Sequence, residues 1–444
     1  MAECTAGRRC GAFAADHRQI PADVQRQPLV SLLNPRASIN VPLCVPPLSS
    51  PTTPLAMHRV LLIAVPLFAL CMVIEWMWGR RMGRNTHDLA DSISSLSQGL
   101  MSLAVAAVTP LFQTGLYAAT LPHVALLPAS AWSSGWGWAA AIIVYDFCDY
   151  WLHRVSHESA IFWAAHAVHH QSERFNLTTA LRQESFYAVM GAPFFLPMAL
   201  LGMPVDLYLG AGLFVLLYQF WIHTELIGKL GWLDRVVSTP SNHRVHHAVN
   251  PGYLDKNYGA VLVIWDRMFG SFTEETEPCV FGTVKPLHSW SPLRAVGQFY
   301  GELFERARAT PRWRDRVRVL FKSPGWAPPG LPAFAPPDEA RLRQPRFVSH
   351  LKPLDIGRAI SLFLATGAAT AMWLDVADDL GEGRNLLAAA VVAIGLSATG
   401  VMLTRGVDEH TASERISRRR AWGIYLIALV LCVGLIAVMT AWQG

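Results

Sequence analysis

The chain has 444 residues, of which 52% are hydrophobic and 16% are charged, and its mean hydropathy is positive. Soluble globular domains carry about 25% charged residues, so this composition excludes an ordinary water-soluble protein and favours an integral membrane protein. The formal net charge is +5, but the basic residues lie between apolar runs and form no stripe with interleaved aromatic residues, which argues against nucleic-acid binding. The seven cysteines include no Cys-x-x-Cys pair, so neither a disulfide framework nor a thiolate zinc site is expected.

The first 56 residues differ from the rest of the chain. Residues 1–56 contain eight prolines, no apolar periodicity and no signal-peptide pattern, and we expect them to be disordered. Alternatively, they are a misassigned extension and translation starts at Met57, where Met-His-Arg leads into an apolar run. No function is assigned to this segment.

Eight apolar runs are long enough to cross a hydrocarbon core of roughly 30 Å. The sequence predicts membrane spans near residues 59–77, 98–119, 133–152, 186–204, 207–223, 357–374, 385–403 and 421–441. Three arginines follow the first span, whereas the 120–132 loop carries nothing more basic than His123, and positive charge marks the cytoplasmic side of a membrane. Alternation then places 153–185 and 224–356 in the cytoplasm. The predicted fold is an all-α, multi-pass membrane bundle of about eight spans with a cytoplasmic helical cap.

Two further segments follow the first five spans. Residues 300–356 are polar and basic, with arginines beside Trp313, Leu320 and Phe321, and we interpret them as an interfacial segment that rests at anionic headgroups. Residues 357–444 hold the last three spans and are expected to form an accessory bundle.

Histidines gather between the spans in three clusters. The clusters are His153-x3-His157, His166-x2-His169-His170 and His243-x2-His246-His247, which together hold eight of the sixteen histidines. Residues i, i+3 and i+4 of an α-helix share one face, so each cluster presents two or three imidazoles together. A single histidine is more often a hydrogen-bonded core residue than a ligand, but packing many such rings together is costly unless a metal ion holds them neutral. His223, in Trp-Ile-His-Thr-Glu, is a candidate ninth ligand.

The ligand types narrow the choice of metal. Imidazole suits zinc, copper, iron and nickel, and eight or nine imidazoles are too many for one ion, so the pattern predicts a di-metal site. The clusters contain neither the His-Glu-x-x-His motif of zinc proteases nor the Glu-x-x-His pairs of soluble di-iron bundles. A histidine-only site at a membrane surface indicates oxygen activation on a lipid, because an unactivated C–H bond yields only to a strong oxidant and the bilayer supplies the substrate.

Five polar residues near the clusters are candidates for orienting the ligands or carrying protons: Asp149, Glu173, Asn176, Glu184 and Glu225. Asp149 lies one turn before His153, where a carboxylate can accept an imidazole N–H and select its tautomer. Helix capping and surface polarity explain most of these residues equally well. For Glu225, which stands at a predicted membrane border, we favour a functional role.

The order His-x3-His, His-x2-His-His, His-x2-His-His resembles the fatty acid hydroxylase and sterol desaturase superfamily. The residues around the clusters are similar to the alkylglycerol monooxygenase branch and its bacterial relatives, in segments 169–183, 218–225, 239–247, 255–259 and 264–272. One departure is Asn242, where that branch typically carries another histidine. The resemblance is strong over about 140–290 and covers the flanking spans in outline.

The resemblance implies a membrane-bound, non-haem oxygenase with two Fe ions that hydroxylates a lipid C–H bond with dioxygen. In the alkylglycerol branch the carbon attacked lies beside an ether oxygen. An electron donor is implied, either tetrahydrobiopterin or another external reductant. Residues 57–299 would then form the catalytic domain, and we expect a bacterial inner-membrane protein whose site faces the cytoplasm.

Three alternatives stay open at this point. A sterol or fatty-acid desaturase of the same superfamily would use the same ligands and differ only in its product. A metal-dependent membrane hydrolase would need no oxygen. A metal transporter would place its histidines inside the spans, whereas here they cluster beyond the span ends.

Overall fold

The computed structural model describes residues 53–109, 114–332, 337–404 and 417–443. Throughout these ranges the regular structure is helical, and β structure is limited to two isolated bridges, Val237–Leu262 and Ala248–Phe281. The prediction of an all-α protein is confirmed. Most of the predicted N-terminal extension lies outside the described residues, and helix α1 begins at Thr53, shortly before Met57.

Among the described residues, eight helices are long. They are α1 (Thr53–Arg81), α2 (Leu89–Val108), α4 (Gly135–Glu158), α9 (Val205–Trp221), α12 (Pro292–Ala309), α15 (Pro353–Val376), α16 (Glu382–Thr404) and α17 (Arg418–Gln443). The shorter helices are α3 (Thr114–Val124), α5 (Ala160–His170), α6 (Leu177–Ala180), α7 (Tyr187–Gly191), α8 (Leu196–Leu200), α10 (Pro240–His247), α11 (Ile264–Met268), α13 (Trp313–Phe321) and α14 (Glu339–Leu342). The 3-10 turns are η2 (Ala129–Trp132), η3 (Ala192–Phe195), η4 (Gly231–Arg235) and η5 (Ala377–Asp379).

Four helices of the described chain are long and apolar enough to cross a membrane. They cover Ile63–Arg81, Pro353–Asp379, Glu382–Thr404 and Arg419–Trp442, where four of the predicted spans lie. Shorter apolar segments lie at Tyr187–Leu200 and Val205–Trp221. The chain is therefore a membrane protein. As far as the described residues cover them, the other four predicted spans are not helices that are both long and apolar enough to meet this criterion.

The predicted span at 186–204 is not one helix. It consists of α7, η3 and α8, because Pro193 and Pro197 each stand at the start of a new helical piece and cannot continue the preceding hydrogen-bond ladder. The predicted span at 98–119 falls on α2 and α3, and residues 110–113 between them lie outside the described chain. The spans at 133–152 and 207–223 fall on α4 and α9.

The three C-terminal helices pack on one another, and α15 and α16 also pack on α2. Their shared core includes Met101 of α2, Trp373 of α15 and Val392 and Leu396 of α16, all buried. A second core joins α3, α4, α8 and α9 through Tyr117, whose ring stacks on Tyr208 at 4.2 Å between ring centroids. These packed helices form the scaffold from which the histidines project.

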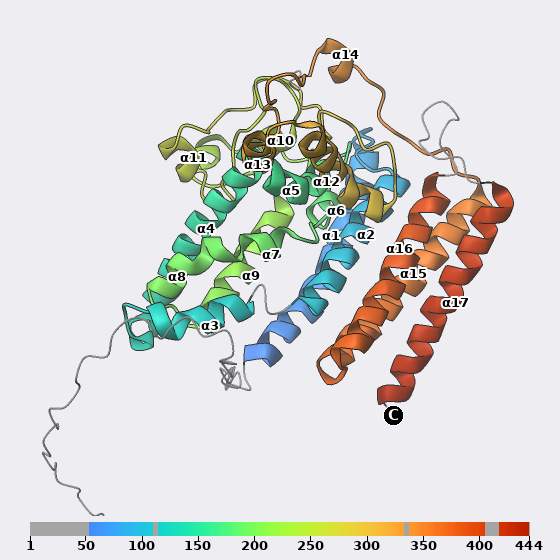
Figure 1. The fold of residues 1–444 in the computed structure, drawn as a ribbon, viewed down its shortest axis with the longest axis horizontal. Coiled ribbons are helices and arrows are strands. Elements are labelled where there is room, and N and C mark those ends of the chain that lie inside the picture. The colour runs from blue at the N-terminus through green and yellow to red at the C-terminus, as the bar shows by residue number, and fades with distance from the viewer. Residues whose placement is uncertain (1–52, 110–113, 333–336, 405–416, 444) are drawn as a thin grey trace, which may run out of the picture. The chain divides into compact units, whose positions relative to one another are not determined.

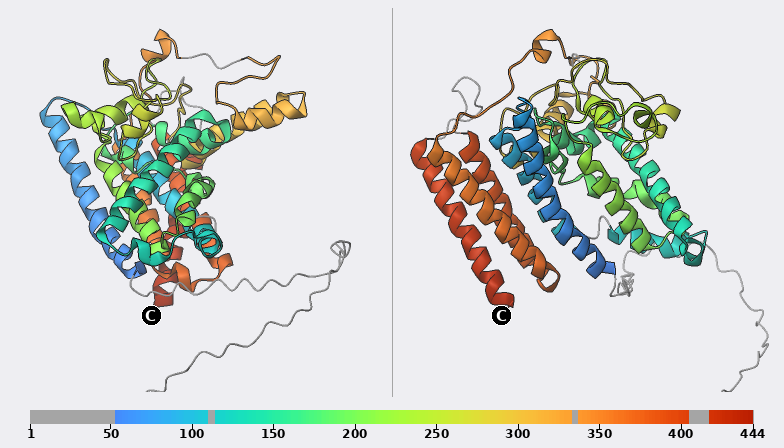
Figure 2. Two further views of the ribbon diagram at one scale, coloured as in Figure 1. Left: turned by 90° about the vertical axis from the view of Figure 1, so that its left-hand side faces the viewer. Right: turned by 180° about the vertical axis from the view of Figure 1, so that it is seen from behind.

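Short helices and loops gather at one end of the long helices. Figure 1 shows α5, α10, α11 and α13 there, and the two further views in Figure 2 agree. The turn from α4 into α5 takes place at Ser159, whose extended backbone ends one helix and begins the next. Helix α10 begins after Thr239, an N-cap residue followed by Pro240 at the first helical position. These local signals bring the three histidine clusters to the same end of the molecule.

Candidate metal centre

Nine buried histidines converge from four places in the chain: α4, α5, the end of α9, and α10. They form two groups, and within each group the candidate ligand atoms all lie within 4.8 Å of one another. We name as site A the group His153, His157, His166, His170 and His246. We name as site B the group His169, His223, His243 and His247.

The two sites do not correspond to the sequence clusters. On α5, His166 and His170 are four residues apart and belong to site A, whereas His169 belongs to site B. On α10, His243 and His247 are four residues apart and belong to site B, whereas His246 belongs to site A. A helix turns by about 100° per residue, so residue i+4 is offset by about 40° from residue i and residue i+3 by about 60° in the opposite sense, which leaves i+3 and i+4 about 100° apart. Each of these two helices therefore contributes to both sites.

The ring nitrogens within each site are close together. In site A, Nε2 of His166 lies 3.0 Å from Nε2 of His153 and 3.0 Å from Nε2 of His170. In site B, Nε2 of His223 lies 3.1 Å from Nε2 of His169 and 2.9 Å from Nε2 of His243. His223, isolated in the sequence, is thus central to site B.

The other ring nitrogen of four of these histidines donates to a backbone carbonyl. Nδ1 of His153 donates to the Tyr258 carbonyl at 2.8 Å, and Nδ1 of His169 donates to the Arg182 carbonyl at 3.0 Å. Nδ1 of His223 donates to the Gln219 carbonyl at 2.7 Å, and Nδ1 of His246 donates to the Lys256 carbonyl at 3.0 Å. A carbonyl oxygen only accepts, so Nδ1 carries the proton in each ring. A neutral imidazole has one proton, and Nε2 therefore presents a lone pair to the site.

This donor set fits metal ions. In site B, the lone pairs of His169 and His223 face each other at 3.1 Å, an arrangement that is repulsive unless a cation lies between them. When two imidazole nitrogens bind one ion at about 2.1 Å each and their bonds to the ion form a right angle, the nitrogens lie about 3.0 Å apart. This value matches the observed separations. Nε2 of His157 and Nε2 of His246 are also buried without a hydrogen-bond partner. Burial lowers the pKa of His153 to about 3 and of His169 to about 4, which keeps both rings neutral, as ligation requires.

Among the five polar candidates, Glu184 contacts a histidine of the centre. Its Oε1 lies 2.6 Å from Nδ1 of His166, and both side chains are buried. Asp149 does not have the expected role, because the Nδ1 proton of His153 goes to the Tyr258 carbonyl instead. The Tyr258 carbonyl lies in a loop and accepts from Nδ1 of His153 at 2.8 Å, whereas the Asp149 side chain, on the same helix as His153, does not.

Two of the other three candidates hold loops in place. Glu173 accepts a hydrogen bond from the backbone N–H of Phe347 at 2.6 Å. Asn176 caps α6 and its amide donates to the Thr86 carbonyl at 2.8 Å. Glu225 is half-buried, and burial raises the pKa of its carboxyl group while nearby arginines oppose that shift.

A short turn places one of the carbonyl acceptors. Asp255 and Asn257 adopt left-handed backbone conformations, with φ of 56° and 55°, and the carbonyl of Lys256 between them receives the His246 proton. Asp255 also places its carboxylate 3.3 Å from Nδ1 of His157. Non-glycine residues adopt positive φ at a cost, and Asp and Asn tolerate it best, so the Asp-Lys-Asn sequence suits this turn.

Arg182 is a residue of the site that sequence reasoning missed. Its side chain is only 2% exposed, its Nε donates to the Val168 carbonyl at 2.7 Å, and its own carbonyl accepts from His169. Burial raises the pKa of Asp91 to about 6 and lowers the pKa of Arg182 to about 10, so both remain charged at neutral pH and attract each other. Arg182 lies in the segment 169–183 that carries the family resemblance, but nothing in the sequence assigns it a role at the centre.

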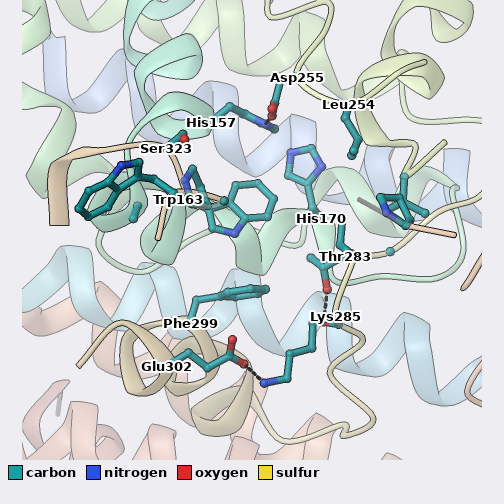
Figure 3. A pocket seen from close by; sticks show the side chains of 18 of the residues that line it. His157, Trp163, His170, Leu254, Asp255, Thr283, Lys285, Phe299, Glu302 and Ser323 are labelled. Atoms are coloured by element: carbon teal, nitrogen blue, oxygen red, sulfur yellow. Dashed lines mark hydrogen bonds and ion pairs between the residues drawn. The ribbon is translucent and has the colours of Figure 1, made fainter. Parts of the chain in front are cut away.

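A cavity of about 380 Å³ opens beside site A. His157, His170 and His246 of site A and His247 of site B line it, and aromatic rings of Trp163 and Phe299 form part of its wall. Figure 3 shows these two rings between the histidines and an ion pair at the opposite side, Lys285 with Glu302 at 2.8 Å. The cavity is therefore mostly apolar, with a few polar groups at defined positions.

Comparison with known proteins agrees with this geometry. The family model for fatty acid hydroxylases matches residues 138–271. Alkylglycerol monooxygenase of Xenopus tropicalis is 38% identical over 65% of this chain and 62% of its own length, and that of Homo sapiens is 38% identical over 60% and 58%. The chain thus aligns with about three fifths of these two relatives. Alkylglycerol monooxygenase of Danio rerio is 34% identical over 82% of this chain and 81% of its own length. No solved structure matches the chain significantly.

Fold and site together define a helical membrane protein with two buried histidine sites that could hold metal ions. The sequence comparisons narrow this class. The chain belongs to the fatty acid hydroxylase superfamily, on its alkylglycerol monooxygenase branch, and the relatives named above are monooxygenases, which are oxidoreductases.

Proposed function

We propose that this protein is a membrane-bound di-iron oxygenase that hydroxylates a lipid C–H bond, at the carbon beside the ether oxygen of an alkylglycerol. The observation that carries the proposal is the pair of buried sites, with five and four histidines, of which site A borders an apolar cavity. Its relatives named alkylglycerol monooxygenase support the choice of hydroxylation over desaturation.

The residues of sites A and B would hold one iron each. When bound, the two ions supply the redox chemistry that activates dioxygen. The protein holds the imidazoles in the required tautomer through backbone carbonyls, which bind no proton of their own and so keep the Nε2 lone pairs directed inward. Trp163 and Phe299 provide an apolar wall for an alkyl chain and exclude water from the reacting carbon.

The overall reaction consumes one dioxygen, two electrons and two protons, and yields a hydroxylated lipid and water. Hydroxylation beside an ether oxygen gives a hemiacetal, whose C–O bond breaks to release an aldehyde and a free alcohol. The two electrons require an external reductant, and tetrahydrobiopterin, expected from the resemblance, gains no support from the described residues.

We further propose that the chain crosses the membrane about eight times and that the histidine end faces the cytoplasm of a bacterial inner membrane. The four long apolar helices and the two shorter apolar segments support a multi-pass topology. Residues 57–299 would form the catalytic domain, since all nine histidines lie within them.

The test is anaerobic reconstitution with ferrous iron and an alkylglycerol, followed by oxygen-18 gas and a panel of two-electron reductants. We expect one labelled oxygen atom in the aldehyde or its hydrated form. A new double bond without label would establish the desaturase alternative, and cleavage without oxygen would establish the hydrolase. Either result would overturn the proposal.

A further inference from the structure

Helix α13 has two opposite apolar faces. Trp313, Val317 and Phe321 are spaced by four residues and share one face, where they are 69%, 47% and 60% exposed. Val319 lies on the other side of the helix and is buried. A nine-residue helix that exposes three large apolar side chains in one stripe has an uncovered surface that water disfavours.

Arginines border this stripe on both sides. At about 100° per residue, Arg316 falls on one flank and Arg314 and Arg318 fall on the other. The guanidinium of Arg314 lies 5.6 Å from the centre of the Trp313 ring. Apolar residues flanked by cations are the pattern of a helix that lies in the headgroup region of an anionic membrane, and they do not match an acidic protein groove as well because the centre of the stripe is uncharged.

The neighbouring helix α12 lies at the boundary of the apolar helices. Its first turn follows Ser291, whose backbone passes close to Gly400 near the end of α16. Farther along α12, the hydroxyl of Tyr300 lies 3.8 Å from the sulfur of Met190, in the short apolar segment that contains α7. Helix α12 thus runs between two membrane-type segments, and α13 packs against it.

The buried face of α13 forms part of the cavity wall. Val319 packs with Leu303 of α12 and with Ala160 and Ala164 of α5. Val319 and Leu303 both line the cavity beside site A, as does the segment Ser323–Trp326 that follows α13. One short helix therefore separates the cavity from the exposed apolar stripe.

We infer that α13 lies in the surface of an anionic phospholipid bilayer, with Trp313, Val317 and Phe321 inserted among the lipids, and that the cavity beside site A receives its substrate across this helix. The bilayer contact is inferred from the exposure of these three side chains, the arginines on both sides of them and the position of α12. The role as substrate entrance rests in addition on the proposed function.

The contact is tested by site-specific photocrosslinking of the full-length, iron-loaded protein in nanodiscs that contain phosphatidylglycerol. A benzophenone amino acid replaces Val317 in one variant and Phe321 in another. The matched control places it at Arg343, directly after α14, where the side chain is 80% exposed. Figure 1 shows α14 farther from the long apolar helices than α13, and the inferred bilayer contact is confined to α13. We expect lipid adducts at both α13 positions, roughly tenfold above the control, because an inserted side chain is surrounded by acyl chains. Equal labelling at all three positions, or adducts to a second copy of the chain or to another protein, would overturn the inference.

The entrance is tested separately by kinetics. A variant with Trp313, Val317 and Phe321 all changed to serine is compared with wild type on a membrane-embedded alkylglycerol and on a short-chain, water-soluble analogue. We expect the KM for the embedded substrate to rise roughly fivefold or more while kcat and the rate on the analogue stay unchanged, because only transfer from the bilayer is impaired. An equal loss on both substrates would refute the entrance role. Lipid crosslinking without any oxygenase activity would instead refute the proposed function and leave the bilayer contact intact.

Discussion

Removal of the Glu184 carboxylate is expected to weaken iron binding at site A and to leave site B nearly unchanged. Oε1 of Glu184 lies 2.6 Å from Nδ1 of His166, and the two side chains are only 7% and 4% exposed. In Glu184→Ala, the His166 imidazole loses its hydrogen-bond partner at Nδ1, in a place that water does not reach. The proton and the lone pair of this ring are then no longer held in a fixed direction.

The size of the effect follows from the contact. Burial raises the pKa of Glu184 to about 8, so the contact is a hydrogen bond of a largely neutral carboxyl group. Leaving its buried partner unsatisfied costs about 1–3 kcal/mol, and each 1.4 kcal/mol is about tenfold in affinity. Iron affinity at site A should therefore fall by roughly 10- to 100-fold, which is also the usual range for losing a group that orients a metal ligand. Glu184→Gln keeps an acceptor oxygen, and we expect a loss of less than about tenfold.

The assay is iron titration against a chelator of known affinity, with metal content measured by mass spectrometry. Glu173→Ala is the matched control, because Glu173 is an acidic residue of the same region whose carboxylate accepts from the Phe347 backbone and touches no histidine. The reasoning is refuted if Glu184→Ala binds two irons with wild-type affinity, or if the control loses iron equally.

Three other substitutions test separate parts of the structure. His223→Ala should reduce bound iron from about two to about one per chain, because this ring contacts two partners in site B, whereas His123→Ala, at an exposed position on α3, should leave the count unchanged. Asp91→Asn should alter the pH dependence of Tm. Burial raises the pKa of Asp91 from 3.8 to about 6, so the folded wild-type protein binds this proton more tightly than the unfolded chain does. Wild-type stability is therefore lost as pH rises from about 4 to about 6. The Tm of the variant relative to wild type should increase over that interval, and a constant difference would contradict the burial argument. Gly202→Ala should destabilise the protein by about 2–4 kcal/mol in detergent, since φ is +75° and a Cβ would collide with the Leu127 carbonyl, and an unchanged Tm would contradict it.

Much of the fold was predictable because its signals are local. Apolar runs about twenty residues long predict membrane helices from composition, and four of the predicted runs are present as helices long and apolar enough to cross a membrane. The interruption of the 186–204 run was also readable from Pro193 and Pro197, but the run was interpreted by its hydropathy alone. Hydropathy measures the transfer of side chains into lipid and does not register the missing N–H of proline.

The histidines of the centre were predictable, but their partition was not. Spacing within one helix places the rings of each cluster on a common face, whereas the structure separates His169 from His166 and His170, and His246 from His243 and His247. Which face of α5 meets which face of α10 depends on how the helices are packed, and no local pattern contains that information. For the same reason the sequence offered Asp149 as the partner of His153, while the fold supplies the Tyr258 carbonyl from a loop far along the chain.

The sequence alone determined the residue types, the helical periodicity and the family, because composition, spacing and motifs are properties of neighbouring residues. Tertiary structure alone decided the division into sites A and B, the carbonyls that select the histidine tautomers, and the buried position of Arg182. Backbone carbonyls are present at every residue and carry no identity in the sequence. They acquire a role in the centre only when the fold brings a particular one within hydrogen-bond distance of an imidazole.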